Sequence, residues 1–185
     1  MSENKDLYIH QKLVEGAKRN SRNAQSQLYE LYYKSIFNSC YRIIGDVYAA
    51  EDLMQDAFID AFKNIHQHKE EVSFGAWLKK IAINECINYL KRKQLIAQKL
   101  EVYSIENIET EEQSARFTVA EIKHALKELA PNYRLVFSLY LIEGYDHDEI
   151  ASILNISAST SRSQLSRAKK QVKNILENIT IRQHE

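Results

Sequence analysis

The residues of this sequence best suited to chemistry are basic and short polar side chains that gather near its C-terminus. Residues 158–176 contain five Arg or Lys and no acidic residue. Arg and Gln can form paired hydrogen bonds with base edges in the major groove of DNA, while Ser and Lys reach phosphates. The pattern therefore favours contact with duplex DNA, and the residues expected to make it are Arg162, Ser163, Gln164, Ser166, Arg167, Lys169 and Lys170.

A second polar set, in the middle of the chain, also suits bases and phosphates. Its members recur at intervals of three or four residues and would share one face of a helix; they are Lys80, Asn84, Asn88, Lys91 and Arg92. Just before this helix lies a polar segment, residues 66–71, which includes His66 and His68. A loop beside a basic helix could hold an unstacked base. Both histidines are therefore candidates for contact with such a base.

The first polar set lies in a segment, residues 147–165, that has the pattern of a helix-turn-helix. Ile150 and Leu154 would point one helix into a core, and Asn155 falls at the turn, where a residue must adopt the left-handed conformation. Ser157 or Ser159 could cap the second helix, whose core side would be Leu165 and Ala168. A plain solvated basic helix is the alternative interpretation of the same charges.

The pattern of the first half of the chain predicts packed helices. An apolar stripe at three- and four-residue spacing predicts a helix; its members are Ala50, Leu53, Met54, Ala57, Phe58, Ala61, Phe62 and Ile65. Gly45 would end the preceding helix and Asp46 would cap this one. That preceding helix would bury Leu28, Leu31, Tyr32 and Ile36. Residues 46–62 carry five acids and no Lys or Arg, so the exposed face should be acidic.

Composition points to an all-α chain of two small domains. Hydrophobic residues make up 44% of the 185. With only four Gly and one Pro, the chain has few of the residues that form the turns between the strands of a sheet. We expect domains at residues 1–93 and 118–185, joined by an acidic linker at 94–117. The second domain would begin with a helix that buries Val119, Ile122, Ala125, Leu126 and Leu129, and Pro131 would begin the next helix. Net charge is zero, but the charges segregate into blocks that suit opposite partners.

Several classes of protein are disfavoured. The sequence has no signal peptide and no apolar run of bilayer length, which predicts a soluble cytoplasmic protein without membrane contact of its own. It has none of the common catalytic motifs, and no cofactor is expected. His66 and His68 with a cysteine fall short of the four convergent ligands of a structural metal site. Cys40 and Cys86 are expected to be core residues of a reducing compartment.

Two blocks resemble a known family. AEDLMQDAFIDAFKNI (residues 50–65) and FGAWLKKIAINECINYLKRK (residues 74–93) look like region 2 of the extracytoplasmic-function (ECF) sigma factors, and residues 126–176 look like their region 4. The resemblance implies a non-enzymatic subunit that takes RNA polymerase to particular promoters. It also implies contacts with the polymerase β′ coiled coil and β flap, with promoter DNA and with an anti-sigma factor.

The resemblance also assigns roles to residues. Asp52, Gln55 and Asp56 would contact the coiled coil. The set from Lys80 to Arg92 would face the -10 strand, with residues 66–71 capturing a flipped base, and the set from Arg162 to Lys170 would face the -35 duplex. Ser159, Ser161 and Gln164 depart from the family pattern, so the -35 preference of relatives does not transfer.

Rival interpretations explain less. A stand-alone helix-turn-helix repressor or activator accounts for residues 118–176 but leaves the acidic face and the polar helix of the first half without a role. A purely structural adaptor is a weaker alternative. The five Glu between Leu100 and Ser114 resemble a nucleic-acid mimic for a positively charged channel, and a solvated spacer explains them nearly as well.

Overall fold

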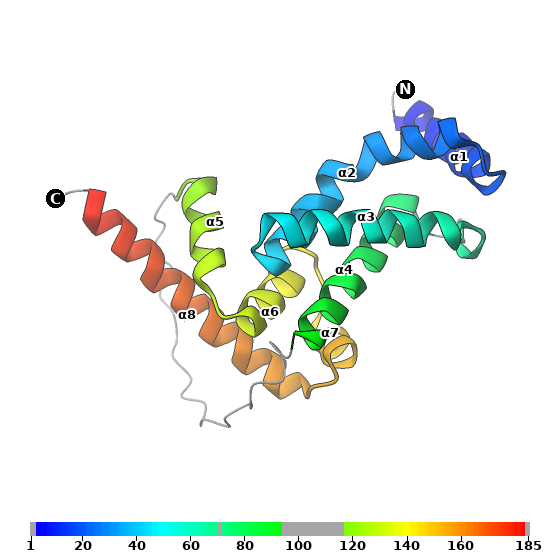
Figure 1. The fold of residues 1–185 in the computed structure, drawn as a ribbon. Helices are drawn as coiled ribbons and strands as arrows, with labels where there is room; N and C mark the ends of the chain where they lie inside the picture. Colours follow the sequence, from blue (N-terminus) through cyan, green and yellow to red (C-terminus); the bar gives the residue numbers. More distant parts are fainter. Residues whose placement is uncertain (1–2, 70–71, 94–116, 184–185) are drawn as a thin grey trace. The chain divides into compact units, whose positions relative to one another are not determined.

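The computed structural model describes residues 3–69, 72–93 and 117–183, and every regular element in these ranges is helical (Figure 1). The prediction of an all-α chain is confirmed. The chain forms two compact units, Met1–Tyr89 and Leu90–Glu185. The predicted linker lies outside the described residues, apart from Phe117. The predicted domain limits therefore remain predictions.

The first unit contains helices α1 (Glu3–Lys18), α2 (Arg22–Ile44) and α3 (Val47–Lys63), a short 3-10 turn η1 (Ile65–Gln67), and α4 (Phe74–Arg92), which runs past the boundary between the units. Gly45 ends α2 in the left-handed conformation, at φ 77°. Asp46 then caps α3, its carboxylate accepting a hydrogen bond from the Ala49 backbone N–H at 2.8 Å. Both predicted helix boundaries are confirmed, because each depends on one local residue type.

The core of this unit lies where α2 packs against α1 and α3. The predicted stripe of α3 is buried as expected, except that Phe62 is half-buried. On α2 the prediction was wrong at Leu31, which is half exposed, whereas Leu28 and Ile36 are buried. Cys40 of α2 and Cys86 of α4 are buried free thiols. A hydrogen bond with Cys40 and burial both favour the protonated thiol of Cys86 and raise its pKa. Their burial makes both cysteines core residues.

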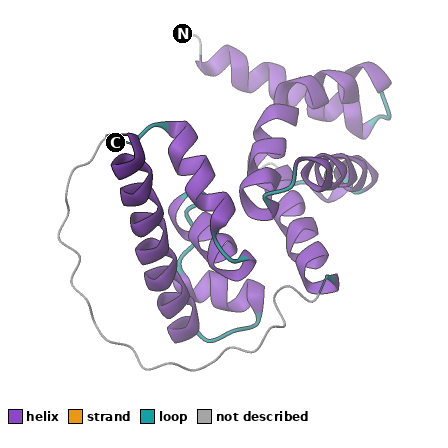
Figure 2. Ribbon diagram, turned by 60° about the vertical axis from the view of Figure 1, so that its left-hand side comes forward, coloured by secondary structure: helices purple, strands orange, loops and turns teal. Residues whose placement is uncertain are grey.

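The second unit places α8 (Ala158–Gln183) against three shorter helices: α5 (Val119–Glu128), α6 (Pro131–Leu141) and α7 (His147–Leu154) (Figure 2). Thr118 and Glu121 form a capping box at the start of α5, and Pro131 is the first residue of α6, as predicted. Ala125, Leu126 and Leu129 pack against the apolar side of α8. Val119 and Ile122 were wrongly expected in this core and are exposed.

Candidate nucleic-acid interfaces

The helix-turn-helix of the second unit is built by two caps and one left-handed residue. The Asp146 carboxylate accepts hydrogen bonds from the backbone N–H groups of Asp148 and Glu149, both at 2.8 Å, and begins α7. Asn155 ends α7 at φ 56°, as the turn was predicted to require. Ser157 then caps α8 by accepting a hydrogen bond from the Thr160 backbone N–H at 3.0 Å. Local sequence thus fixes the direction in which α8 leaves the turn.

The predicted duplex-binding residues fall on different sides of α8. Four of them are exposed, and with Lys173 they recur along one face of the helix: Arg162, Ser166, Lys169 and Lys170. Ser163 and Arg167 are half-buried at its edges, and the Ser163 hydroxyl donates a hydrogen bond to the Ser159 carbonyl at 3.0 Å. The exposed face is therefore cationic along its length, with no acid beside it on residues 158–176.

Gln164 does not lie on this face, which corrects the prediction that its side chain would face the duplex. Only 6% of the residue is exposed, because it precedes Ala168 by four residues and shares the buried stripe of Leu165, Ala168 and Val172. That spacing was present in the sequence and could have placed Gln164 inside. Arg162, two residues earlier, points to the opposite side and stays exposed.

The polar set on α4 lies on one exposed face, as the three- and four-residue spacing predicted. Five side chains are exposed: Lys80, Asn84, Asn88, Lys91 and Arg92. The opposite face is buried and includes Leu78, Ala82 and Ile83. A helix with this division presents amides and ammonium groups together, which suits hydrogen bonds to unpaired bases and contacts with phosphates.

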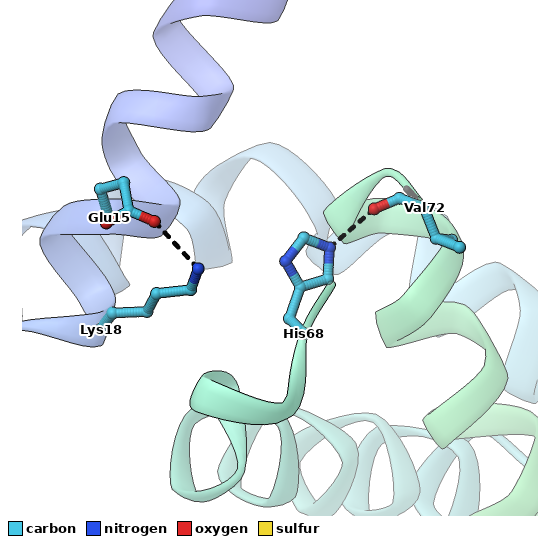
Figure 3. A network of polar contacts seen from close by, with 4 residues as sticks. All are labelled: Glu15, Lys18, His68 and Val72. Carbon is cyan, nitrogen blue, oxygen red and sulfur yellow. Dashed lines mark hydrogen bonds and ion pairs between the residues drawn. The ribbon is translucent and has the colours of Figure 1, made fainter. Parts of the chain in front are cut away.

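The loop before α4 is organised around His68, which was predicted to contact a base but is buried. The His68 Nε2–H donates a hydrogen bond to the Val72 carbonyl at 2.7 Å (Figure 3). Its ring lies edge-on to both Trp77, at 5.3 Å, and Phe74, at 5.9 Å between ring centroids. His68 therefore shapes the loop from inside. His66 is exposed and stays a candidate for contact with DNA; Glu70 and Glu71 lie outside the described residues.

Helix α1, which carries none of the predicted site residues, packs against η1 at the base of this loop. Lys18 donates a hydrogen bond to Glu15 Oε1 at 2.9 Å, and this contact lowers the pKa of the exposed Glu15 carboxyl (Figure 3). Arg19 and His66 contribute smaller effects in the same direction. His66 therefore lies close enough to α1 for its charge to act on Glu15. Sequence periodicity gave no sign of this contact between distant segments.

The acidic residues of α3 lie opposite its buried stripe. Asp52, Gln55 and Asp56 are all exposed, and Glu51, Asp60 and Ile59 flank them on the surface. No described Lys or Arg interrupts this helix before Lys63. The three predicted residues are therefore brought together on one anionic face, which suits a basic protein surface.

A polar contact between the helices of the helix-turn-helix was missed in the sequence. Ser161 is fully buried, and its hydroxyl lies 2.9 Å from Nδ1 of His147. Burial lowers the pKa of His147, and the charge of Arg162 adds to this effect. Ser161 was noted only as a departure from the family pattern, and nothing in the local sequence identified its partner fourteen residues away.

The described ranges contain neither of two further classes of site. No group of three or more His, Cys, Asp or Glu side chains is arranged there to hold a metal ion. Nor do these ranges contain a helix long and apolar enough to cross a bilayer.

Comparison with known proteins bears on the whole chain. Residues 28–96 match the Sigma-70 region 2 family, and residues 120–172 match the family of Sigma-70 region 4. The chain is 26% identical to the ECF RNA polymerase sigma factor SigW of Bacillus subtilis (strain 168), over 91% of this chain and 97% of that protein. It is 25% identical to the ECF RNA polymerase sigma-E factor of Escherichia coli (strain K12), over 89% and 92% respectively.

The chain belongs to the extracytoplasmic-function group of RNA polymerase sigma factors. The predicted family is thereby confirmed. As a sigma factor, the protein acts with core RNA polymerase in promoter-specific initiation of transcription. The region 2 match covers α3, the loop and α4, and the region 4 match covers the helix-turn-helix.

Solved structures agree with this sigma-factor fold. One is the sigma factor RpoE of Bartonella quintana in complex with the anti-sigma factor NepR, with a TM-score of 0.55 and 22% identity, covering 82% of this chain and 96% of that chain. Another is CnrH in complex with the cytosolic domain of CnrY, with a TM-score of 0.54 and 21% identity, covering 92% and 98%.

Proposed function

We propose that this sigma factor divides promoter recognition between its two units, with α8 reading the -35 duplex and α4 reading the separated -10 strand. The observation that carries the proposal is the surface of α8. Over residues 158–176 its exposed face presents only cations, hydroxyls and amides, while the opposite face is buried against α5, α6 and α7. Major-groove recognition by a helix-turn-helix needs this division. The residues assigned to the duplex are Arg162, Ser163, Ser166, Arg167, Lys169 and Lys170.

For the -10 element we assign the exposed face of α4 and the exposed His66 beside it. Lys80, Asn84 and Asn88 would meet bases and backbone, with Lys91 and Arg92 on phosphates. His68 would act from inside the loop, since its Nε2–H is used by Val72. Amide side chains and a nearby loop are the parts needed to hold an unstacked base.

For core polymerase we assign Asp52, Gln55 and Asp56 on α3 to the β′ coiled coil, and the second unit to the β flap. The chain would act as a non-enzymatic subunit in the cytoplasm, with a region 2 domain at 1–93 and a region 4 domain at 118–185 joined by the acidic linker. RpoE of Bartonella quintana is held by an anti-sigma factor. We extend that kind of control to this protein.

The test compares Arg162→Ala with Asn84→Ala in holoenzyme, using promoter libraries with duplex or pre-melted -10 segments. Loss of a paired base contact typically costs about 1–3 kcal/mol of discrimination at one position. Arg162→Ala should relax preference within the -35 element and leave use of a pre-melted template intact. Asn84→Ala should weaken use of the -10 element even beside a favourable -35 sequence.

Two outcomes would contradict the proposal. If both substitutions shift preference within one element, the proposed division of labour is wrong. Tight, specific operator binding by the free protein would instead favour action as a stand-alone repressor or activator.

A further inference from the structure

Three consecutive helices of the second unit meet at one imidazole. His147 is the first residue of α7, and its Nδ1 lies 2.9 Å from the hydroxyl of Ser161 on α8. The ring of Tyr140, on α6, is stacked on the imidazole with 4.4 Å between centroids and 24° between planes. The imidazole is thus held on one side by a ring and at its edge by a hydroxyl.

The contact is directional, unlike the apolar packing around it. Ser161 is fully buried among positions such as Leu165 and Ala168, so its hydroxyl needs a hydrogen-bond partner in the interior. The bond joins specific atoms on α7 and α8 and therefore restrains both the distance and the rotation between the helices. Leucine or alanine at this position would restrain only the distance.

The restrained turn of α8 is the one that carries Arg162. Ser161 and Arg162 are adjacent, with the first buried and the second exposed. Arg162 and Lys169, from α8, disfavour a charged imidazole, while Asp146 and Asp148, beside His147 in the chain, favour it. Burial is the largest of these influences and lowers the pKa of His147. The bond survives in either protonation state, because Ser161 can donate to a neutral ring or accept from a charged one.

We propose that Ser161 and His147 are positioning residues for promoter recognition, whose hydrogen bond sets how the exposed face of α8 enters the -35 major groove. Tyr140 holds the imidazole in place for that bond. This inference rests on the assignment of α8 to the -35 element. A small displacement of Arg162 would weaken the paired hydrogen bonds that its guanidinium can make to a base, because such bonds require a specific geometry.

The experiment measures base preference across the -35 element with the full-length protein in holoenzyme, together with the thermal midpoint of the free protein. Ser161→Ala removes the hydroxyl, and His147→Phe keeps a ring on Tyr140 but removes the nitrogen. Each should reduce -35 discrimination about fivefold, the factor that one ordinary hydrogen bond supplies. The double variant should be no worse than either single variant, because the same bond is lost in all three.

Two conservative variants complete the set. His147→Asn places a polar group where Nδ1 lies and should retain most of the discrimination. Ser161→Cys keeps the size of the side chain with a weaker donor and should give an intermediate value in a folded protein. A merely structural contact would lower the thermal midpoint of these variants and leave -35 preference unchanged, and that outcome overturns the proposal.

Arg162→Ala, measured in parallel, separates the positioning role of Ser161 and His147 from the assignment of α8 to the -35 element. If Arg162→Ala changes -35 preference and Ser161→Ala does not, the positioning role is wrong while the assignment of α8 stands. If Arg162→Ala has no effect on -35 preference, the assignment of α8 itself fails.

Discussion

Arg162 and Gln164 lie two residues apart on α8, and the turn of the helix sends their side chains to opposite environments. Arg162 is exposed, while Gln164 is buried beside Leu165. The loop of the first unit repeats this division, with His66 exposed and His68 enclosed by aromatic rings. At the scale of single residues, exposed side chains can contact DNA, whereas buried ones such as Gln164 and His68 shape the surface from inside.

Replacement of Gln164 tests this separation directly. Gln164→Met preserves the shape and roughly the volume of the side chain and removes its amide, so it should cost about 1 kcal/mol, the typical contribution of one hydrogen bond. We therefore expect -35 preference to stay unchanged in transcription from a promoter library, with only a small shift in the urea midpoint. A change of base preference comparable with that of Arg162→Ala would show that Gln164 contacts the -35 duplex after all.

At the scale of helices, the approach of α4 to α2 depends on a residue without a side chain. A Cβ at Gly75 would lie 2.6 Å from Cε1 of Tyr32. The Tyr32 ring has little freedom to move, because its hydroxyl is 2.9 Å from Nδ1 of His10 and its face is tilted against Phe74. Gly75 thus lets the helix that bears Asn84 begin close to the core of its unit.

Gly75→Ala should destabilise the first unit by about 1–3 kcal/mol, the usual cost of overpacking, although alanine is normally the better helix former. The neighbouring exposed residue supplies the matched control. Ala76→Gly should cost about 0.5–1 kcal/mol through helix propensity alone. Chemical unfolding of the two variants measures both. A stabilising effect of alanine at position 75 would show that the approach of the helices is not tight.

At the scale of the whole molecule, zero net charge conceals separate anionic and cationic surfaces. Helix α3 presents acids, whereas the exposed face of α8 presents cations. A few cationic residues give only weak, salt-sensitive contact with DNA. This distribution suits a protein that reads promoters after it has joined a larger enzyme, to which we have proposed that the acidic face attaches.

Asp56→Arg should therefore weaken association with core polymerase, since like charges across an interface can cost several kcal/mol. Helical content by circular dichroism should not change, because Asp56 is exposed. Glu30→Arg, an equal charge reversal at an exposed site on α2, is the control and should bind normally. Core binding by Asp56→Arg at the level of this control would remove residues 52–56 from the proposed interface.

Features set by neighbouring residues could be predicted from the sequence. The stop at Gly45, the cap at Asp46 and the left-handed turn at Asn155 each depend on one residue type at one place. The exposed face of α4 followed from helical spacing alone. Contacts between distant segments could not be predicted, because periodicity says which side of a helix is buried but does not identify the partner. The bond between Ser161 and His147 and the packing of α1 against η1 are of this kind.

The packing of the loop before α4 has an optical consequence. Trp77 is the one tryptophan of the chain, and its ring lies 5.3 Å from that of His68. Excitation at the red edge of the absorption band selects tryptophan over the eleven tyrosines. The emission of the unlabelled protein therefore originates beside the loop assigned to base capture. Any rearrangement of His68 would alter the quenching of that emission, so the free protein carries its own reporter of the packing beside this loop.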